Sequence, residues 1–170
     1  MCIRDSYLGL VDRIRNRMPD IALSTDIIVG FPGETEEDFE QTLSLAETVR
    51  YAQAYTFIYS KRAGTPAAEI DDPTPHEVIL GRFNRLVKVI ETTAHEYNQG
   101  ELHTVVPALI EGTSKKNDAV LLGKSPKNQT VHAPIPEGYS IDQLVGKIVD
   151  VDVDVAKTWY LSGSVVGEPR

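Results

Sequence analysis

Residues 24–39 constrain the fold more than any other segment, because they have the pattern of a strand that runs through a tight turn into a helix. The sequence STDIIVGFPGETEEDF starts with an apolar, β-branched run, continues with a glycine- and proline-rich turn and ends in acidic residues. Thr35 and Asp38 have the spacing of a capping pair at a helix N-terminus. This geometry is typical of βα junctions that bind nucleotides, so we expect an α/β domain here.

One acidic residue, Asp26, lies inside the expected strand. A buried carboxylate needs a partner, because an unpaired charge is costly to remove from water. At the ligand end of a parallel strand, such an acid is well placed to bind the two hydroxyls of a ribose. The same residue could instead cap a neighbouring turn, and both interpretations remain open from the residues alone.

The elements of the first part follow in the order helix, strand, helix, strand. Apolar residues recur at helical spacing over residues 7–18 and 35–50, and β-branched or aromatic side chains fill residues 21–29 and 51–60. A capping box at residues 74–77 predicts a further long helix that reaches about Asn98. Because two strands cannot close a barrel, residues 1 to about 72 are expected to be the end of a larger (β/α) domain.

After Gly100 the pattern changes to short β-rich runs. We expect five strands, at residues 104–111, 118–123, 130–133, 147–155 and 160–166, and this spacing suggests a small closed or partly open barrel. In the fourth run, valines from Val149 to Val155 alternate with aspartates, so the valines should face the core and the aspartates the solvent. Such an acidic face should repel a phosphate backbone.

Charge limits where a nucleic acid could bind. The 170 residues carry a net charge of −8, so any RNA contact requires a local basic patch. Lys115, Lys116, Lys124 and Lys127 flank turns of the second part, with only Asp118 among them to oppose their charge. These lysines are candidates for phosphate contacts. A solubilising loop surface explains the same composition equally well.

Composition also excludes several classes of protein. No run approaches the roughly 20 apolar residues of a membrane span, and the N-terminus lacks the apolar core of a signal peptide, so a cytoplasmic location is expected. The single cysteine, Cys2, cannot alone hold an iron–sulfur cluster. It lies in MCIRDS, a segment that need not be native. We therefore assign no catalytic or metal-ligating residue to this chain.

Two segments of the first part, DIIVGFPGET and YTFIYSKRAGTPAA, resemble the late barrel strands of the radical S-adenosylmethionine methylthiotransferases, most closely the MiaB type that modifies tRNA. In the second part, LIEGTSKKN, LLGKSPKNQTVH and LVGKIVDVDV are similar to a TRAM domain, a small RNA-binding barrel. The resemblance implies an α/β and then all-β chain. Residues 1–100 would be the C-terminal portion of a radical SAM, TIM-like (β/α) barrel with its closing helix, and residues 101–168 a five-stranded, OB-like TRAM barrel.

The resemblance also implies an activity for a longer parent protein. Members of the family use S-adenosylmethionine and two [4Fe-4S] clusters to place a methylthio group on an N6-isopentenyladenosine beside the tRNA anticodon. The cysteines that bind those clusters are absent from this chain. The chain alone is therefore expected to be inactive and monomeric, with the tRNA anticodon stem-loop as partner of the parent, while the sulfur donor stays unidentified.

Six residues match the family's cofactor-binding positions. Asp26 matches the acid that faces the nucleoside ribose, Gly30 and Gly33 the turn, Phe57 and Tyr59 the strand beside the adenine, and Arg62 the RxGTPA loop. Ala63 stands where the family usually has proline, which should make this loop more flexible. Arg62 could bind a phosphate or the methionyl carboxylate, or simply pair with Glu34 or Glu69. For RNA, the candidates are Lys115, Lys116, Lys124, Lys127 and His132.

Other functions remain open at this point. Related methylthiotransferases act on threonylcarbamoyl-adenosine in tRNA or on a ribosomal protein, and they use similar barrels. Residues 101–170 could alternatively act as a free-standing, non-catalytic RNA-binding barrel. A TIM-barrel enzyme of unrelated chemistry is disfavoured, because the sequence offers no convincing acid and base pair and no metal-ligand cluster.

Overall fold

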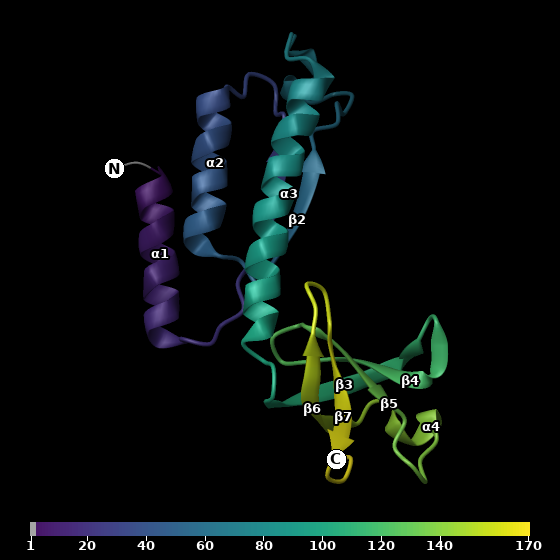
Figure 1. Cartoon of the computed structure of the whole chain (residues 1–170). Helices are drawn as coiled ribbons and strands as arrows, with labels where there is room; N and C mark the ends of the chain where they lie inside the picture. Colours follow the sequence, from purple (N-terminus) through teal and green to yellow (C-terminus); the bar gives the residue numbers. More distant parts are fainter. Residues whose placement is uncertain (1–2) are drawn as a thin grey trace. The chain divides into compact units, whose positions relative to one another are not determined.

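The computed structural model describes residues 3–170 and divides into two compact units, Met1–Thr93 and Ala94–Arg170 (Figure 1). The long helix α3 (His76–Gln99) starts in the first unit and ends in the second. Neither α3 nor another helix in the described part of the chain is long and apolar enough to cross a membrane. Cys2 lies outside the described residues.

The first unit is built around a two-stranded parallel sheet. Its elements before α3 are α1 (Ile3–Arg17), β1 (Ser24–Val29), α2 (Glu36–Val49), β2 (Gln53–Ile58) and the short 3-10 helix η1 (Pro66–Glu69). β1 and β2 pair in parallel, with Ser24 opposite Gln53 and Val29 opposite Ile58. The expected order of helix, strand, helix, strand is therefore confirmed.

The core of this unit lies on the side of the sheet that the helices cover. Buried residues from the three helices and both strands meet there, including Val11 of α1, Val29 of β1, Phe39 of α2 and Leu86 of α3. Their burial follows from the helical spacing of apolar residues, which gives each helix one apolar stripe to pack against the sheet. The opposite face of the sheet has no such cover from the described residues of this unit.

Local signals explain how α2 begins. The Thr35 hydroxyl accepts from the backbone N–H of Asp38, and the Asp38 carboxylate accepts from the backbone N–H of Thr35, which confirms the capping box. The equivalent expectation for α3 is wrong. The Thr74 hydroxyl donates to Asp72 Oδ1 at 2.7 Å, and α3 begins at His76.

The second unit is a closed five-stranded barrel with the strand order β3-β4-β5-β7-β6. All neighbours are antiparallel except β5 and β7. The five strands confirm the expected barrel: β3 (Val105–Ser114), β4 (Asn117–Lys124), β5 (Thr130–Pro134), β6 (Ile148–Ala156) and β7 (Leu161–Val166). A four-residue helix, α4 (Ile141–Leu144), was not predicted, and its Leu144 is fully buried in the barrel core.

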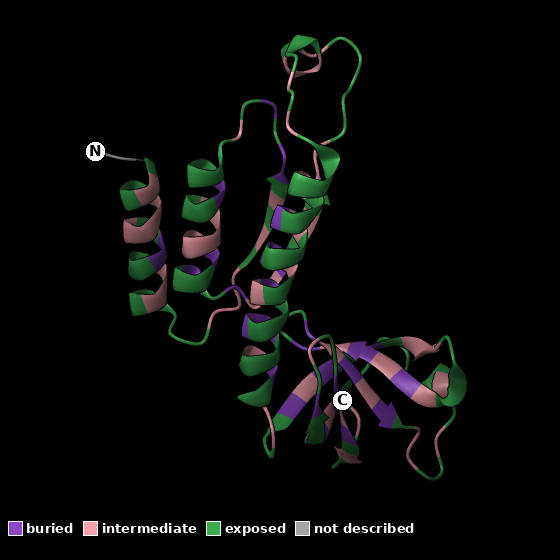
Figure 2. Cartoon of the chain, turned by 45° about the horizontal axis from the view of Figure 1, so that its top comes forward, coloured by how far each residue is buried: buried purple, intermediate pink, exposed green. Residues whose placement is uncertain are grey.

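Buried and exposed residues alternate along the barrel strands, as Figure 2 shows. Val149, Val151 and Val153 of β6 are fully buried, as their alternation predicted. The prediction for Val155 is wrong, because a β-bulge between Val153 and Val155 shifts the register. Val155 is exposed, and Ala156 takes the inward position instead.

Candidate nucleoside pocket and nucleic-acid interface

The uncovered face of the β1–β2 sheet carries one acid among apolar side chains. The parallel register places Asp26 opposite Tyr55, and Ile28 opposite Phe57. Because side chains alternate between the two faces of a strand, these four residues share one face. Asp26 is exposed, and about half of the surface of each of the other three is exposed. The sheet therefore presents an apolar surface with a carboxylate in its middle.

A pocket of about 590 Å³ lies over this face. Four of the six expected cofactor-binding residues line it, namely Asp26, Phe57, Tyr59 and Arg62. The lining also includes Ile58, which lies between Phe57 and Tyr59 on the expected strand. It further includes residues that sequence reasoning did not single out: Ile28, Phe31, Ser60, Thr65 and Ala67. For Phe31 a signal was present, since it lies in the GFPG turn that follows the strand.

Two aromatic side chains form one wall of the pocket. The rings of Phe31 and Tyr59 meet edge to face, with centroids 5.2 Å apart. The Tyr59 hydroxyl is buried and has no hydrogen-bond partner among the described residues. A buried hydroxyl without a partner is costly, so this oxygen is suited to a group that the described chain does not supply.

The two expected glycines shape the turn and do not line this pocket. Gly30 and Gly33 both have positive φ angles, 73° and 86°. A side chain at Gly30 would also place its Cβ 2.6 Å from Cγ2 of Ile79. The backbone N–H of Gly30 donates to Glu34 Oε2 at 2.9 Å. The GFPG turn thus sets the path of the chain at the edge of the pocket.

Arg82 of α3 holds this turn, a role that sequence reasoning missed. Its guanidinium is almost fully buried and donates to the Glu34 backbone oxygen at 2.9 Å and to Glu36 Oε2 at 2.8 Å. It also pairs with Glu34 Oε2 at 3.3 Å. The pKa of Glu36 lies below its ordinary range, chiefly because Arg82 donates to it. No local pattern indicates a contact between residues 46 or 48 positions apart.

Arg62 is exposed, and its side chain makes no hydrogen bond with another described residue. The suggested pairing with Glu34 or Glu69 is therefore wrong, and Glu34 pairs with Arg82. The loop after Arg62 is closed by Thr65, whose hydroxyl donates to the Arg62 backbone oxygen at 2.8 Å. The guanidinium is thus left available at the rim of the pocket.

The four lysines proposed for RNA contacts do not lie together. Lys115 and Lys116 occupy the turn between β3 and β4, whereas Lys124 and Lys127 lie at the opposite end of β4. At roughly 3.3 Å per residue, an eight-residue strand separates the two pairs by about 23 Å. Two separate pairs of lysines therefore replace the single basic patch that the sequence suggested.

The two pairs of lysines also differ in how they are held. Lys115 and Lys116 are exposed, and their ammonium groups bond no other described residue. Lys124 donates to the Thr130 hydroxyl at 3.0 Å, and Lys127 pairs with Glu101 at 2.6 Å. The remaining candidate, His132, approaches the Leu121 backbone oxygen at 3.2 Å. Its ring meets that of Tyr160 edge to face at 5.5 Å.

The outer side of β6 is acidic, as expected. Asp152 and Asp154 are exposed, and Asp150 pairs with Arg170, whose Nη2 lies 2.9 Å from Asp150 Oδ1. This pairing holds the pKa of Asp150 below its ordinary range. Within residues 3–170, no group of three or more His, Cys, Asp and Glu side chains could hold a metal ion.

Comparison with known proteins agrees with this architecture. Residues 100–166 match the model of the TRAM domain. Relatives named tRNA-2-methylthio-N(6)-dimethylallyladenosine synthase match nearly the whole chain. The protein from Acetivibrio thermocellus is 48% identical over 96% of the chain, that from Geobacillus kaustophilus 47% over 97%, and that from Alkaliphilus oremlandii 42% over 97%.

The chain is similar to these synthases over nearly its whole length, and its second unit matches the TRAM domain. It corresponds to their C-terminal part and spans about a third of their length, 33%, 30% and 34% for the three relatives named. The TRAM match coincides with the closed barrel of the second unit, which confirms the small OB-like barrel expected there. About two thirds of each relative therefore lies outside the matched region.

Proposed function

We propose that this chain is the C-terminal part of an enzyme that transfers a methylthio group to an N6-isopentenyladenosine beside the tRNA anticodon. The observation that carries this proposal is the pocket over the uncovered β1–β2 face, where Asp26, Phe57, Tyr59 and Arg62 converge. The names of the relatives support the reaction, and the TRAM match supports RNA as the substrate. Without the rest of the parent, we expect the chain to be inactive.

The pocket residues suit S-adenosylmethionine. Asp26 can accept hydrogen bonds from the two ribose hydroxyls, and Phe57 offers an apolar surface for the adenine. Arg62 at the rim can pair with the methionyl carboxylate through two N–H groups. The buried Tyr59 hydroxyl has no partner among residues 3–170 and can donate to a ligand oxygen or nitrogen. When bound, S-adenosylmethionine would supply the radical chemistry of the family.

The iron–sulfur clusters do not fit this chain. A cluster of this kind is held by several thiolates, and the sequence contains one cysteine. The cluster ligands must therefore come from the remainder of the parent. The contribution of this chain is one apolar wall of the pocket, where Ile28 and Phe57 would help to exclude water from the reacting groups once the rest of the parent covers this face.

The second unit would bind the RNA through the lysine pairs at the two ends of β4. Lys115 and Lys116 are the better phosphate ligands, because their ammonium groups are exposed and bond no other described residue. Lys127 is partly neutralised by Glu101, so its contribution should be smaller. The separation of the two pairs suits contacts with phosphates on different parts of a folded RNA.

We would test this function by measuring the binding of an unmodified tRNA anticodon stem-loop to the 170-residue chain over a series of salt concentrations. One variant changes Lys115 and Lys116 to Gln, and a second changes Lys124 and Lys127 to Gln. A control changes Lys88 and Lys147, exposed lysines outside these sites, and alters the net charge equally.

The proposal predicts weak, salt-sensitive binding that decreases most in the first variant. Each lost phosphate contact should reduce the slope of log affinity against log salt by about 1. If the chain bound no RNA, or if the control variant weakened binding as much as the first variant, this assignment of RNA contacts would be wrong.

A further inference from the structure

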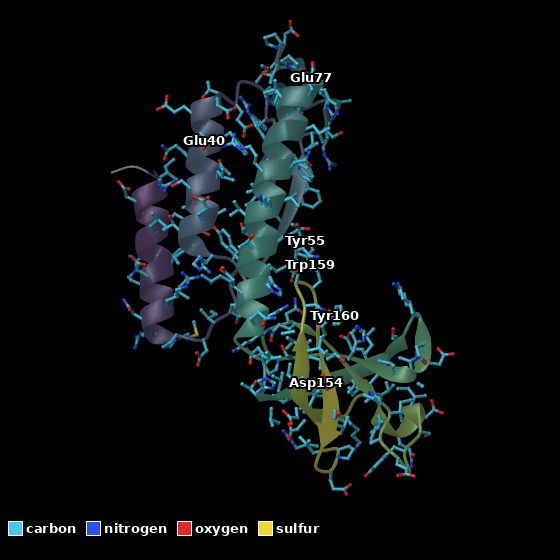
Figure 3. All side chains as sticks on the ribbon, viewed as in Figure 1. Glu40, Tyr55, Glu77, Asp154, Trp159 and Tyr160 are labelled. Carbon is cyan, nitrogen blue, oxygen red and sulfur yellow. The ribbon has the colours of Figure 1, made fainter. Side chains whose placement is uncertain are left out.

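The hairpin between β6 and β7 presents two aromatic side chains to solvent. Only Thr158 and Trp159 form its tip, because the Lys157 backbone N–H donates to the Tyr160 backbone oxygen at 2.9 Å. Trp159 is 51% exposed and Tyr160 38% exposed. Figure 3 shows both residues at the end of this hairpin. A ring that stays exposed gains little free energy of burial in the folded chain, so these two adjacent rings remain available to a partner.

Hydrogen bonds from the end of α3 hold the hairpin in place. Asn98 Nδ2 donates to the backbone oxygens of Lys157 at 2.7 Å and of Thr158 at 3.1 Å. The Gln99 side chain donates to the Ala156 backbone oxygen at 2.7 Å. Asn98 is itself buried and accepts from the Gln129 side chain at 2.9 Å. Every carbonyl from 156 to 158 therefore has a side-chain donor, and the loop is ordered before any partner binds.

The strands beside the hairpin supply polar donors next to these rings. His132 meets the edge of the Tyr160 ring and pairs in register with Ser162 of β7. On β4, Lys124 pairs in register with Thr130 of β5. All four polar side chains alternate with buried core residues, so they lie on the outer surface of β4, β5 and β7.

We propose that Trp159 and Tyr160 form a stacking platform for an unpaired nucleobase of RNA, with His132 and Lys124 beside it to contact the sugar and phosphate. This inference rests on the proposed function, because it names the RNA feature that the second unit recognises. Aromatic faces stack on any base, and each stacked base strengthens binding by about 5- to 150-fold. A preordered loop keeps most of this increase in affinity, because little side-chain or loop entropy is lost on binding.

The test uses the natural fluorophore of the platform. Trp159 is the only tryptophan in the chain, so its emission reports on this hairpin alone. The 170-residue chain is titrated with an RNA hairpin that has an unpaired loop, with a fully paired duplex of the same length, and with heparin, a polyanion without bases. Stacking predicts that the unpaired loop quenches the fluorescence strongly and that the duplex and heparin quench it little.

Variants separate stacking from charge. Trp159→Ala should weaken binding of the RNA hairpin by about tenfold or more, whereas Trp159→Phe, which keeps an aromatic face, should retain most of the affinity. Val145→Ala removes apolar surface from an exposed site elsewhere on the barrel and should leave binding unchanged. Circular dichroism of each variant shows whether the barrel is folded.

The outcomes distinguish the two proposals. Binding that depends on Lys115 and Lys116 but is unchanged in Trp159→Ala, with no quenching, would overturn the platform and leave the proposed function intact. Absence of RNA binding in every form would overturn the platform and also the assignment of RNA contacts to the lysines. Equal quenching by duplex, heparin and hairpin RNA would show that Trp159 responds to charge or to protein contacts, and it would also overturn the platform.

Discussion

Gly163 of β7 is the residue that tolerates a side chain least. A Cβ at this position would lie 1.9 Å from the Asp152 backbone oxygen and 2.7 Å from its carbonyl carbon. Neither atom can rotate away, because both belong to the paired strand β6. The close approach of the two backbones in this part of the barrel therefore depends on glycine.

Gly163→Ala should destabilise the barrel by about 3 kcal/mol or more, because β6 and β7 must separate to admit the methyl group. Gly112→Ala is the control, since no atom lies within 4 Å of its added Cβ. Urea unfolding followed by Trp159 fluorescence measures both variants. An unfolding midpoint shared by the two variants would contradict the assigned contact.

The cap and the burial of single residues were predicted correctly where a local sequence pattern determines them. The Thr35 and Asp38 cap follows from a three-residue spacing, and the burial of Val149 follows from alternation. Val155 was misplaced because a bulge changes alternation without leaving a mark in the sequence. Tyr59 was expected beside the adenine, but only the structure shows that its hydroxyl is buried without a partner among the described residues.

At the scale of elements, the junction of α2 and α3 depends on one buried arginine. Arg82→Ala should destabilise the first unit by about 3 kcal/mol, because it leaves the nearly buried Glu34 carboxylate without its cation. Arg85 also pairs with α2, through Glu36 and Glu40, but all three side chains are about half exposed. Arg85→Ala should therefore cost less than about 1 kcal/mol. Urea unfolding of both variants, followed by circular dichroism, measures the difference.

The acidic start of α2 makes the first unit sensitive to acid. Hydrogen bonds from Thr35 hold the pKa of Asp38 below its ordinary 3.8, and Arg82 holds that of Glu36 below 4.5. Carboxyls with lowered pKa stabilise the fold above the pKa of the unfolded chain, and this contribution is lost as the pH falls through the lowered values. The unit should therefore become less stable below about pH 4.5.

Asp38→Asn tests this dependence. The variant should be less stable than the unchanged chain at pH 7. The difference should be smaller at pH 3, because this pH lies below the ordinary 3.8 of Asp38 and the stabilisation by its carboxylate is lost as the pH falls toward the lowered pKa. Glu47→Gln removes a charge from an exposed position on the same helix and serves as the control. Thermal unfolding at both pH values measures the effect, and a difference that stayed constant for Asp38→Asn would contradict it.

For the whole molecule, the sequence predicted the helices, strands and fold class better than the positions of side chains relative to one another. The parallel βαβ unit and five-stranded barrel follow from periodicity and turn residues, which are local. The grouping of Lys115 with Lys124 did not follow, because sequence proximity does not show that β4 places them at opposite ends. Trp159 and Tyr160 were not predicted as a site, because their loop is ordered by Asn98, about 60 residues earlier.

The second unit depends on residues that precede the TRAM match. The TRAM match starts at residue 100, yet Asn98 and Gln99 bond the β6–β7 hairpin, and Asn98 also bonds the buried Gln129. A fragment of residues 94–170 should therefore be more stable than one of residues 101–170. The shorter fragment leaves Gln129 and hairpin carbonyls without partners, at about 1–3 kcal/mol for each group that stays buried.

The same contacts can be tested in the 170-residue chain, so the prediction does not depend on how the fragments fold. Asn98→Ala should destabilise the barrel by about 2 kcal/mol, while Asn84→Ala, at an exposed position on the same helix, should not. Asn98→Ala should also weaken RNA binding, because a loosened hairpin must be ordered on binding. Stability and affinity that both stayed unchanged would show that the end of α3 does not support the hairpin of the second unit.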